Sequence, residues 1–317
     1  MGDIIVVGNI TSDFFMDTKV AESLQDKQTS ICYPISSKIF VKKMNMFTGG
    51  GGYNSSVSFS RLGLKPSFLG KITKDAQGKG LLKALRKEKI KFIGSLGNGI
   101  GSYSVILDSA EHHRTIFVFK GKDNHLLKKD FKHPKTKWYY FASMIGESMK
   151  TQIEIAKHAK KVGSKIAYNP SEYLIREDKE KVLRLVKLVD VLILNKEEAD
   201  LIVGKEKVAE KIRALGPEIV CITDGKNGAV AYEGDKVYGV LPKNVKVKET
   251  AGAGDAFASG FLAGWIKREN MKEALEFGVT NAESVIGHLG ATNNLLTWQQ
   301  MLSKVKKNPH RIKVSRW

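Results

Sequence analysis

The sequence predicts an α/β protein in three layers, with a mostly parallel central sheet covered by helices on both faces. Two observations support this fold class. Short apolar runs, typical of strands buried on both faces, alternate along the chain with amphipathic segments of helical period. The chain has 317 residues, 42% of them hydrophobic, which is long enough for one large domain of this kind.

The expected elements follow one another in order. The strands are short apolar runs at Ile4–Val7, Lys137–Phe141, Lys165–Tyr168, Val191–Leu194 and Ile219–Thr223. The helices carry apolar residues three or four positions apart, at Asn54–Leu62, Gly78–Lys87, Lys150–Val162, Glu180–Leu188 and Lys207–Ala214. No internal repeat divides the chain, so residues 1–317 are expected to form a single domain.

Two regions depart from this alternation. Residues 29–47 are rich in β-branched and aromatic side chains without helical period, and residues 103–120 contain two strand-like runs around a polar turn, which predicts a β-hairpin. Together with residues 13–18, they are expected to form a small sheet that acts as a lid over a site. Arg114, at the start of the second hairpin strand, could contact a substrate from this lid. The open edge of such a sheet can pair with a second copy, so a homodimer through the lid is one alternative.

The net charge of +19 raises the question of nucleic-acid binding. The lysines are spread along the whole chain, and no zinc-finger, RNP or recognition-helix pattern is present, which favours a solvated basic surface suited to anionic substrates. No apolar run approaches the ~18 residues that a membrane span needs. Cys32 and Cys221 form no CxxC pair, so a cytoplasmic protein is expected. The basic tail, residues 304–317, is either a loose arm or a partner-binding end.

Residues 249–255 read Glu-Thr-Ala-Gly-Ala-Gly-Asp and lead into a helical run. A glycine-rich turn that opens a helix points backbone N–H groups at one spot, where the helix dipole adds positive charge. Gly252, Ala253 and Gly254 could thus form an anion hole for a transferring phosphoryl group, while Asp255 accepts a proton from the attacking hydroxyl. The alternative is an ordinary turn with Asp255 as a helix cap. The segment lacks the Gly-Lys-[Ser/Thr] of a Walker P-loop.

Residues 48–52 read Thr-Gly-Gly-Gly-Gly and precede the helix that Asn54 is expected to open. Four consecutive glycines are expected to form neither a helix nor a stable strand, so we predict a loop that approaches a ligand closely. A flexible linker is the alternative. Near the N-terminus, a buried strand ends in polar residues up to Asp13. Ligands gather beyond the carboxyl ends of parallel strands, so Asp13 is a candidate to bind substrate hydroxyl groups, with a turn acid as the alternative.

Two further polar segments directly follow buried strands. Asn195 and Glu198 lie three positions apart and suit Mg²⁺ held through water beside phosphates. The same pair would also form a helix capping box. The segment from Thr223 to Gly228 is a turn that could hold phosphate or ribose, or a simple β-turn.

In their order and spacing, these segments resemble the PfkB, or ribokinase-like, family of sugar and nucleoside kinases, from Ile4 to about Leu302. The motifs that carry the resemblance are the glycine run with Asn54 and Arg61-Leu62-Gly63; Gly70–Asp75 with Gly78, similar to G-x-[VI]-G-x-D-x-x-G; Asn195–Glu198, which matches N-x-x-E; and Glu249–Phe257, similar to D-T-x-G-A-G-D.

The resemblance implies a ribokinase-like core with a β-lid, and transfer of the γ-phosphoryl group of ATP, with Mg²⁺, to an alcohol. A small sugar, through a hydroxymethyl group, is the first expectation for the acceptor, and a nucleoside is the alternative. The resemblance also implies a role for each matching residue: Asp255 as the base beside the anion hole of residues 252–254; Asp13, Gly49, Gly50 and Asn54 at the acceptor; and Asn195, Glu198, Thr223, Gly225, Gly228 and Asn281 at the nucleotide, with Glu198 holding Mg²⁺ through water and Asn281 near the adenine.

This chain departs from the family pattern in several places. Glu249 stands where the family has Asp, and Ala251 follows it, in the stretch that builds a K⁺ site in some members, so potassium activation stays open. Gly51 replaces the Lys of ribokinases, which speaks against ribose. Residues 290–294 with Trp298 look similar to nucleoside-kinase members. A non-catalytic ligand sensor on the same fold is a further alternative, and the intact Asp255 argues against it.

Overall fold

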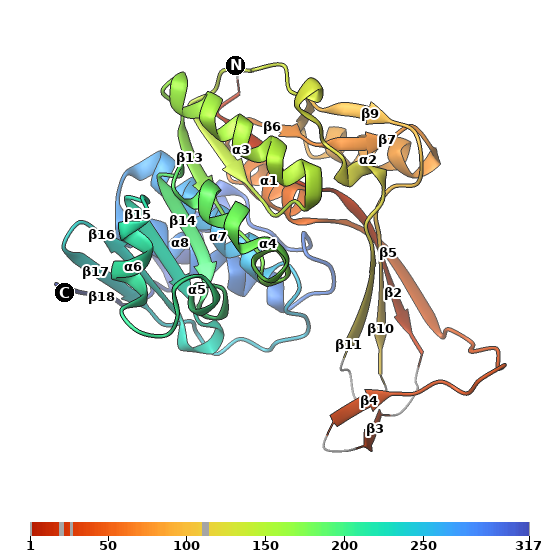
Figure 1. Cartoon of the computed structure of the whole chain (residues 1–317). Coiled ribbons are helices and arrows are strands. Elements are labelled where there is room, and N and C mark those ends of the chain that lie inside the picture. Colours follow the sequence, from red (N-terminus) through yellow and green to blue (C-terminus); the bar gives the residue numbers. More distant parts are fainter. Residues whose placement is uncertain (1, 19–21, 26–27, 110–113, 317) are drawn as a thin grey trace.

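The computed structural model describes residues 2–18, 22–25, 28–109 and 114–316. A central sheet lies between two layers of helices, and a smaller sheet projects from one side of this body (Figure 1). The predicted three-layer α/β/α class with a small second sheet is confirmed.

The central sheet has ten strands in the order β18-β17-β16-β15-β14-β13-β12-β1-β6-β8. Strands β15 through β8 in this order are parallel, and β16, β17 and β18 continue the sheet antiparallel at one edge. All of the strands expected from apolar runs are present within one residue of their predicted bounds. The strand bounds are β1 (Ile4–Val7), β6 (Pro66–Leu69), β8 (Lys91–Phe92), β12 (Trp138–Phe141), β13 (Lys165–Tyr168), β14 (Val191–Asn195), β15 (Ile219–Thr223), β16 (Ala229–Glu233), β17 (Lys236–Val240) and β18 (Ile312–Arg316).

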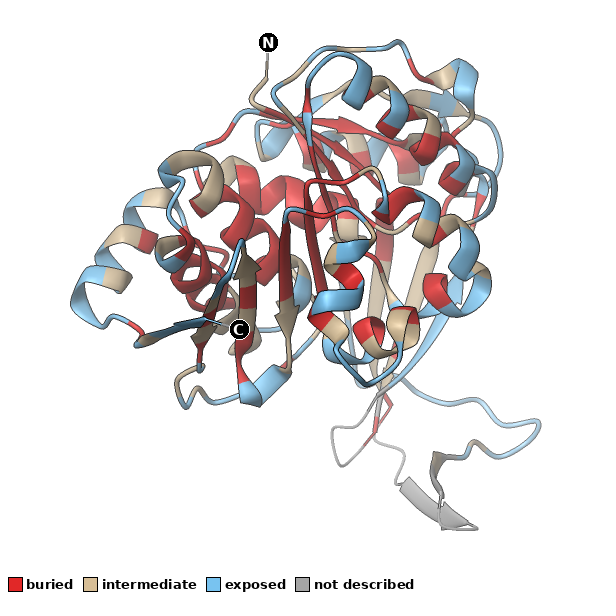
Figure 2. Cartoon of the chain, turned by 60° about the vertical axis from the view of Figure 1, so that its left-hand side comes forward, coloured by how far each residue is buried: buried red, intermediate tan, exposed pale blue. Residues whose placement is uncertain are grey.

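Helices cover both faces of this sheet, and the burial pattern follows them (Figure 2). Along β1, Ile4 and Val6 join the core under one helical layer while Ile5 and Val7 join the core under the other, because successive side chains of a strand point to opposite faces. The first layer contains α1 (Gly51–Arg61), α2 (Ala76–Lys87), α7 (Ala253–Arg268), α8 (Met271–Ile286) and α9 (Trp298–Lys307). The second contains α3 (Gly146–Lys161), α4 (Glu172–Val186), α5 (Lys196–Val203) and α6 (Val208–Ala214).

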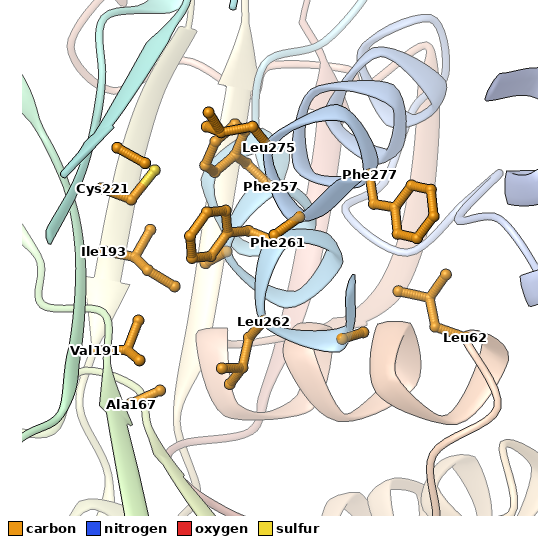
Figure 3. Close-up of a cluster of buried hydrophobic side chains, with 14 of the residues drawn as sticks. Leu62, Ala167, Val191, Ile193, Cys221, Phe257, Phe261, Leu262, Leu275 and Phe277 are labelled. Carbon is orange, nitrogen blue, oxygen red and sulfur yellow. The ribbon is translucent and has the colours of Figure 1, made fainter. Parts of the chain in front are cut away.

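Helix α7 is fixed against the sheet by its apolar side chains. Phe261 and Leu262 point toward Val191 and Ile193 of β14, as Figure 3 shows. On its other side, α7 packs closely on α8, because a Cβ at Gly264 would lie 2.8 Å from the Phe277 ring. The N-terminus of α7 is therefore held at the carboxyl ends of the central strands.

The smaller sheet has the strand order β11-β10-β2-β5. Its strands are β2 (Thr11–Asp17), β5 (Lys43–Gly49), β10 (Tyr103–Asp108) and β11 (Arg114–Phe119). The pairing of Tyr103 with Phe119 confirms the predicted hairpin. Residues 29–47 enter this sheet only through β5, since β4 (Gln28–Ile31) pairs instead with β3 (Glu22–Gln25). A further short pair joins β7 (Lys71–Thr73) to β9 (Ser95–Gly97).

The expectation for the glycine run is wrong, and one of the two alternatives for the basic tail is excluded. The glycine run does form regular structure: Gly49 ends β5, and α1 begins at Gly51 rather than at Asn54. A Cβ at Gly52 would lie 2.8 Å from the Asn9 carbonyl oxygen, so close packing and not flexibility explains the glycine there. The basic tail is no loose arm, because β18 pairs with β17. Among the described residues, no helix is both long enough and apolar enough to cross a membrane.

Candidate active site

The site begins at the N-terminus of α7. Gly252 caps this helix with a φ of +83°, and a Cβ at that position would lie 2.5 Å from the Ala291 Cβ, so only glycine fits. The Ala253 N–H donates to the Thr250 carbonyl at 3.1 Å and is therefore engaged within the turn. The N–H groups of Gly254 and Asp255 have no partner among the described residues. The turn thus presents free donors at Gly254 and Asp255, whereas the Ala253 N–H, expected to contribute to an anion hole, is not available in this conformation.

Asp255 lies in the first turn of α7 and faces the first turn of α1. Asn54 donates from Nδ2 to Asp255 Oδ2 at 2.8 Å, and Asn54 is buried. Burial raises the pKa of Asp255, and the Asn54 hydrogen bond partly offsets this effect. A Cβ at Gly51 would lie 3.3 Å from Asp255 Oδ1, so the start of α1 approaches the other carboxylate oxygen. A buried carboxylate held in one orientation is suited to accept a proton.

Asp13 lies close to the same glycine run. Its carboxylate fills the space beside Gly49, where a Cβ would overlap Oδ2. The Thr11 hydroxyl donates to Asp13 Oδ1 at 2.8 Å. Burial raises the pKa of Asp13. Hydrogen bonds from Thr11 and Ser104 lower it, but by less. The structure therefore brings Asp13, Gly49, Gly50, Asn54 and Asp255 together.

The face of the small sheet that carries Asp13 is partly aromatic. Phe47 is the register partner of Asp13, and Phe15 lies two residues further along β2 on the same face. The Phe15 and Phe47 rings meet edge to face with centroids 5.4 Å apart. A Cβ at Gly290 would lie 3.2 Å from the Phe47 ring, so the loop after α8 also approaches this face. Arg114 begins β11, and its side chain lies outside the described part of the structure.

Asn195 and Glu198 form the capping box at the start of α5. The Glu198 N–H donates to Asn195 Oδ1 at 2.7 Å, and the Asn195 N–H donates to Glu198 Oε2 at 2.9 Å. Both residues also line a cavity of about 240 Å³ together with Gly252, Gly254 and Asp255. Burial raises the pKa of Glu198 to about 7. The two interpretations of this pair, helix cap and ligand contact, are therefore compatible.

A second cavity, of about 580 Å³, adjoins the first, and Thr223 and Gly254 line both. Gly225 and Gly228, two of the residues expected at a nucleotide, lie in its wall. Its other walls are largely apolar, with Val247, Phe257 and Val279 among them. A polar cavity at a helix N-terminus that opens into an apolar one matches the phosphates and the base of a nucleotide.

Asn281 does not line either cavity. Its side chain is fully buried, where Nδ2 donates to Ser58 Oγ at 3.0 Å and to the Ala256 carbonyl at 2.8 Å. It ties α8 to α1 and α7, so the expected position beside the adenine is wrong for this side chain. Other residues of α8, including Ala282 and Glu283, line the larger cavity instead.

Asn169 and Glu283 are among the cavity residues that the sequence did not predict. Asn169 lines the smaller cavity directly after β13, while Asn195 is the last residue of β14. Its position after a buried strand could therefore have identified Asn169. Glu283 lines the larger cavity from the last turn of α8, and one acid among several in a helix gives no such signal.

Three known proteins illustrate what this chain is similar to. It is 27% identical to a 5-dehydro-2-deoxygluconokinase of Clostridium perfringens, over 96% of this chain and 93% of that protein. The structure superposes on a nucleoside kinase of Methanocaldococcus jannaschii, an archaeal member of the ribokinase family, with a TM-score of 0.81 and 21% identity, covering 97% of this chain and 99% of that one. It superposes on the ribokinase of Cryptococcus neoformans in complex with ADP with a TM-score of 0.75 and 19% identity, covering 96% and 99%. At these identities, the two solved structures show a common fold.

A family model described as pfkB family carbohydrate kinase matches residues 20–298 of this chain. The match spans most of the 317 residues and includes both glycine-rich segments and the whole of α7. The chain therefore belongs to the pfkB family of carbohydrate kinases.

Proposed function

We propose that this kinase transfers the γ-phosphoryl group of ATP to a hydroxyl group of a small sugar, with Asp255 as the general base. The observation that carries this proposal is the position of Asp255. It lies in the first turn of α7, beside the free N–H of Gly254, and lines the polar cavity that continues into the apolar one. The base thus adjoins the space suited to the transferring group.

The transfer needs one proton movement and one exchange of bonds at phosphorus. Asp255 takes the proton of the acceptor hydroxyl, and the oxygen forms a bond to the γ-phosphorus while the bond to the β–γ bridging oxygen breaks and ADP leaves. The N–H groups of Gly254 and Asp255, with the dipole of α7, stabilise negative charge on the transferring group. Asp13 accepts hydrogen bonds from other acceptor hydroxyls, beside Gly49 and Gly50.

The residues of the smaller cavity fit Mg²⁺ held through water. Glu198 uses Oε2 for the Asn195 N–H, so its carboxylate would contact the hydration shell of the ion rather than enclose it. When bound, Mg²⁺ neutralises charge on the β- and γ-phosphates. Asn195 and Asn169 add amide groups that orient phosphates or water in the same cavity.

The small sheet would act as a lid that excludes water from the reaction. Its edge strand β11 exposes Phe117 and Phe119, with 58% and 53% of their surface accessible, and Met46 of β5 is 67% exposed. These apolar positions support pairing with a second lid, so a homodimer is part of the proposal.

We also locate the protein in the cytoplasm, where ATP is available and a reducing environment keeps Cys32 and Cys221 as thiols.

A nucleoside acceptor is favoured by one observation, the aromatic pair Phe15 and Phe47 beside Asp13. Such rings stack on a base, which a simple sugar lacks. A sugar remains the first proposal because the polar groups near Asp255 suit hydroxyls.

The basic surface would serve to attract anionic substrates, and a salt-sensitive shift of an oligonucleotide at physiological ionic strength would argue for nucleic acid instead.

The experiment that tests the proposed function is an ADP-release assay with ATP·Mg²⁺ over pentoses, hexoses, their phosphates and nucleosides. We expect ADP release that depends on at least one acceptor; ADP release that no acceptor increases would contradict the proposal and favour a ligand sensor. Phe47→Ala decides the acceptor class: it should raise the KM of a nucleoside at least tenfold, from the ~1–3 kcal/mol of a stacked base, and change a sugar's KM little. Phe14→Ala, on the opposite face of β2, is the matched control.

A further inference from the structure

Glu283 is the acid in the wall of the larger cavity. It lies on α8 between apolar lining residues such as Ala282 and Ile286, and only 12% of its side-chain surface is exposed. Burial of a carboxylate among apolar groups costs free energy unless hydrogen bonds compensate for the lost water. Glu283 therefore needs hydrogen-bond donors in the folded protein.

Two donors hold Glu283, and both bind the same oxygen. The Lys243 N–H donates to Oε1 at 2.6 Å, and His310 Nε2 lies 2.9 Å from Oε1. No partner for Oε2 is present within the described part of the chain. Burial alone would raise the pKa of Glu283, but the hydrogen bonds from His310 and Lys243 outweigh it and lower the pKa. The group is thus a fixed carboxylate with one free oxygen, which can accept but not donate a hydrogen bond.

His310 comes from the C-terminal tail, just before β18. Its side chain is 1% exposed, and its backbone N–H donates to Glu276 Oε1 at 2.7 Å. Because a carboxylate only accepts, Nε2 carries the proton in its contact with Glu283, and Nδ1 lies 3.4 Å from the Thr280 hydroxyl. Lys243 Nζ also donates to the Asn308 carbonyl. The tail is therefore anchored to the same cavity wall through Asn308 and His310.

We propose that Glu283 reads the base of the nucleotide donor, with Oε2 accepting a hydrogen bond from an exocyclic amino group such as that of adenine. His310 is a positioning residue, which orients the Glu283 carboxylate from the C-terminal tail. The inference rests on the proposed function in taking the larger cavity as the base site. The remaining wall is apolar at Val247 and Phe257, which suits any flat base, and it also carries the polar side chains of Asn244 and Thr250. Glu283 is the acid in this wall, so it supplies the charged acceptor on which the proposed discrimination depends.

The test compares the binding of ATP with that of purine riboside 5′-triphosphate, which has the same ring without the amino group. Calorimetry without an acceptor measures both, so the result does not depend on phosphoryl transfer. We expect the wild-type protein to bind ATP about tenfold more tightly or better, as for a hydrogen bond to a charged acceptor. In Glu283→Gln, the amide oxygen keeps the Lys243 and His310 bonds and the NH₂ replaces Oε2, so the preference for ATP should vanish.

Variants of His310 test its positioning role. His310→Ala should reduce the ratio of the two affinities, and His310→Gln, which can still donate to Glu283, should restore it. Glu273→Gln is the matched control: Glu273 lies on the same helix, pairs with Arg268 and does not line the cavity, so this variant should leave the ratio unchanged. Unfolding temperatures identify any variant that fails to fold.

Three results would overturn the inference: equal wild-type affinities for the two nucleotides, a preference for ATP that persists in Glu283→Gln, or no nucleotide binding at all. Failure to phosphorylate any sugar or nucleoside, with the ATP preference intact, would instead overturn only the proposed function.

Discussion

Asn54 and Asp255 lie 201 positions apart in the sequence and are joined by a hydrogen bond of 2.8 Å. Each stands in the first turn of a helix, Asn54 in α1 and Asp255 in α7. The bond therefore connects the two glycine-rich segments. Through it, Asn54, a residue proposed to contact the acceptor, orients the carboxylate of the proposed base.

Asn54→Ala is expected to change the pH dependence of the reaction. The Asn54 hydrogen bond lowers the pKa of Asp255, so its removal lets burial raise the pKa further. A base acts when deprotonated, so the acidic limb of the kcat/KM profile should move to higher pH. Ser55 follows Asn54 in α1 and donates a hydrogen bond to Tyr140. The control variant Ser55→Ala removes that bond and should leave the acidic limb in place. An unmoved limb in Asn54→Ala would mean that this bond does not tune the base.

Asp255→Asn is expected to keep or increase the stability of the protein above neutral pH. Burial raises the pKa of Asp255 in the folded state, so the folded protein binds this proton more tightly than the unfolded chain does. Stability is therefore lost as pH rises from the unfolded pKa through the folded pKa, and Asn removes that loss. Urea unfolding without nucleotide should show a difference in favour of the variant at pH 8 that shrinks toward pH 4. A variant less stable at pH 8 would contradict this account of the carboxylate.

Gly254→Ala is expected to separate folding from nucleotide binding. No atom lies within 4 Å of a Cβ at Gly254, so the helix should tolerate alanine and gain up to about 1 kcal/mol of stability. The added methyl group would occupy the space beside the free N–H groups, so the KM for ATP should rise at least tenfold, if one phosphate hydrogen bond of ~1.5 kcal/mol or more is lost. Gly80→Ala in α2, also open around its Cβ, should give the stability gain alone. Equal KM values in the two variants would argue against the anion site.

Potassium is expected to activate this kinase little. Glu249 is buried and its Oε1 accepts the Ala251 N–H at 3.3 Å, so the longer side chain turns back onto its own loop. Initial rates in K⁺ and in tetramethylammonium should agree within about twofold. Both are measured at equal ionic strength, so that the screening of surface charges is the same in the two salts. A rate increase of tenfold or more in K⁺ would show that this loop still builds a cation site.

The sequence allowed much of the fold to be predicted, because buried parallel strands are short apolar runs whose bounds are sharp. The strands β1, β13 and β15 agree with their predicted bounds at both ends. The start of α1 was missed because glycine has a low helix propensity, so a run of glycines does not predict a helix. At position 52 glycine is nevertheless required, because a Cβ there would lie too close to the Asn9 carbonyl oxygen. Contacts between distant segments overrode the local preference.

The candidate site was predictable where it follows strand ends and helix starts. Asn195, Thr223 and Asp255 stand at such positions, and the structure brings them to the same pair of adjoining cavities. Asp13 instead lies within β2, beside Gly49. Asn281 was misassigned because the sequence does not show which face of a buried helix meets a cavity. Glu283 and His310 were missed because their hydrogen bond joins the last turn of α8 to the C-terminal tail, a contact that only the tertiary structure reveals.

The most direct test of the central claim is the turnover number of Asp255→Asn with the best acceptor of the screen, at saturating ATP·Mg²⁺. The wild-type protein should phosphorylate the acceptor, and the variant should bind ATP with similar affinity while its kcat falls by about 10²–10⁴-fold, the usual contribution of a general base. A kcat close to that of the wild-type protein would contradict the assignment of Asp255 as the catalytic base.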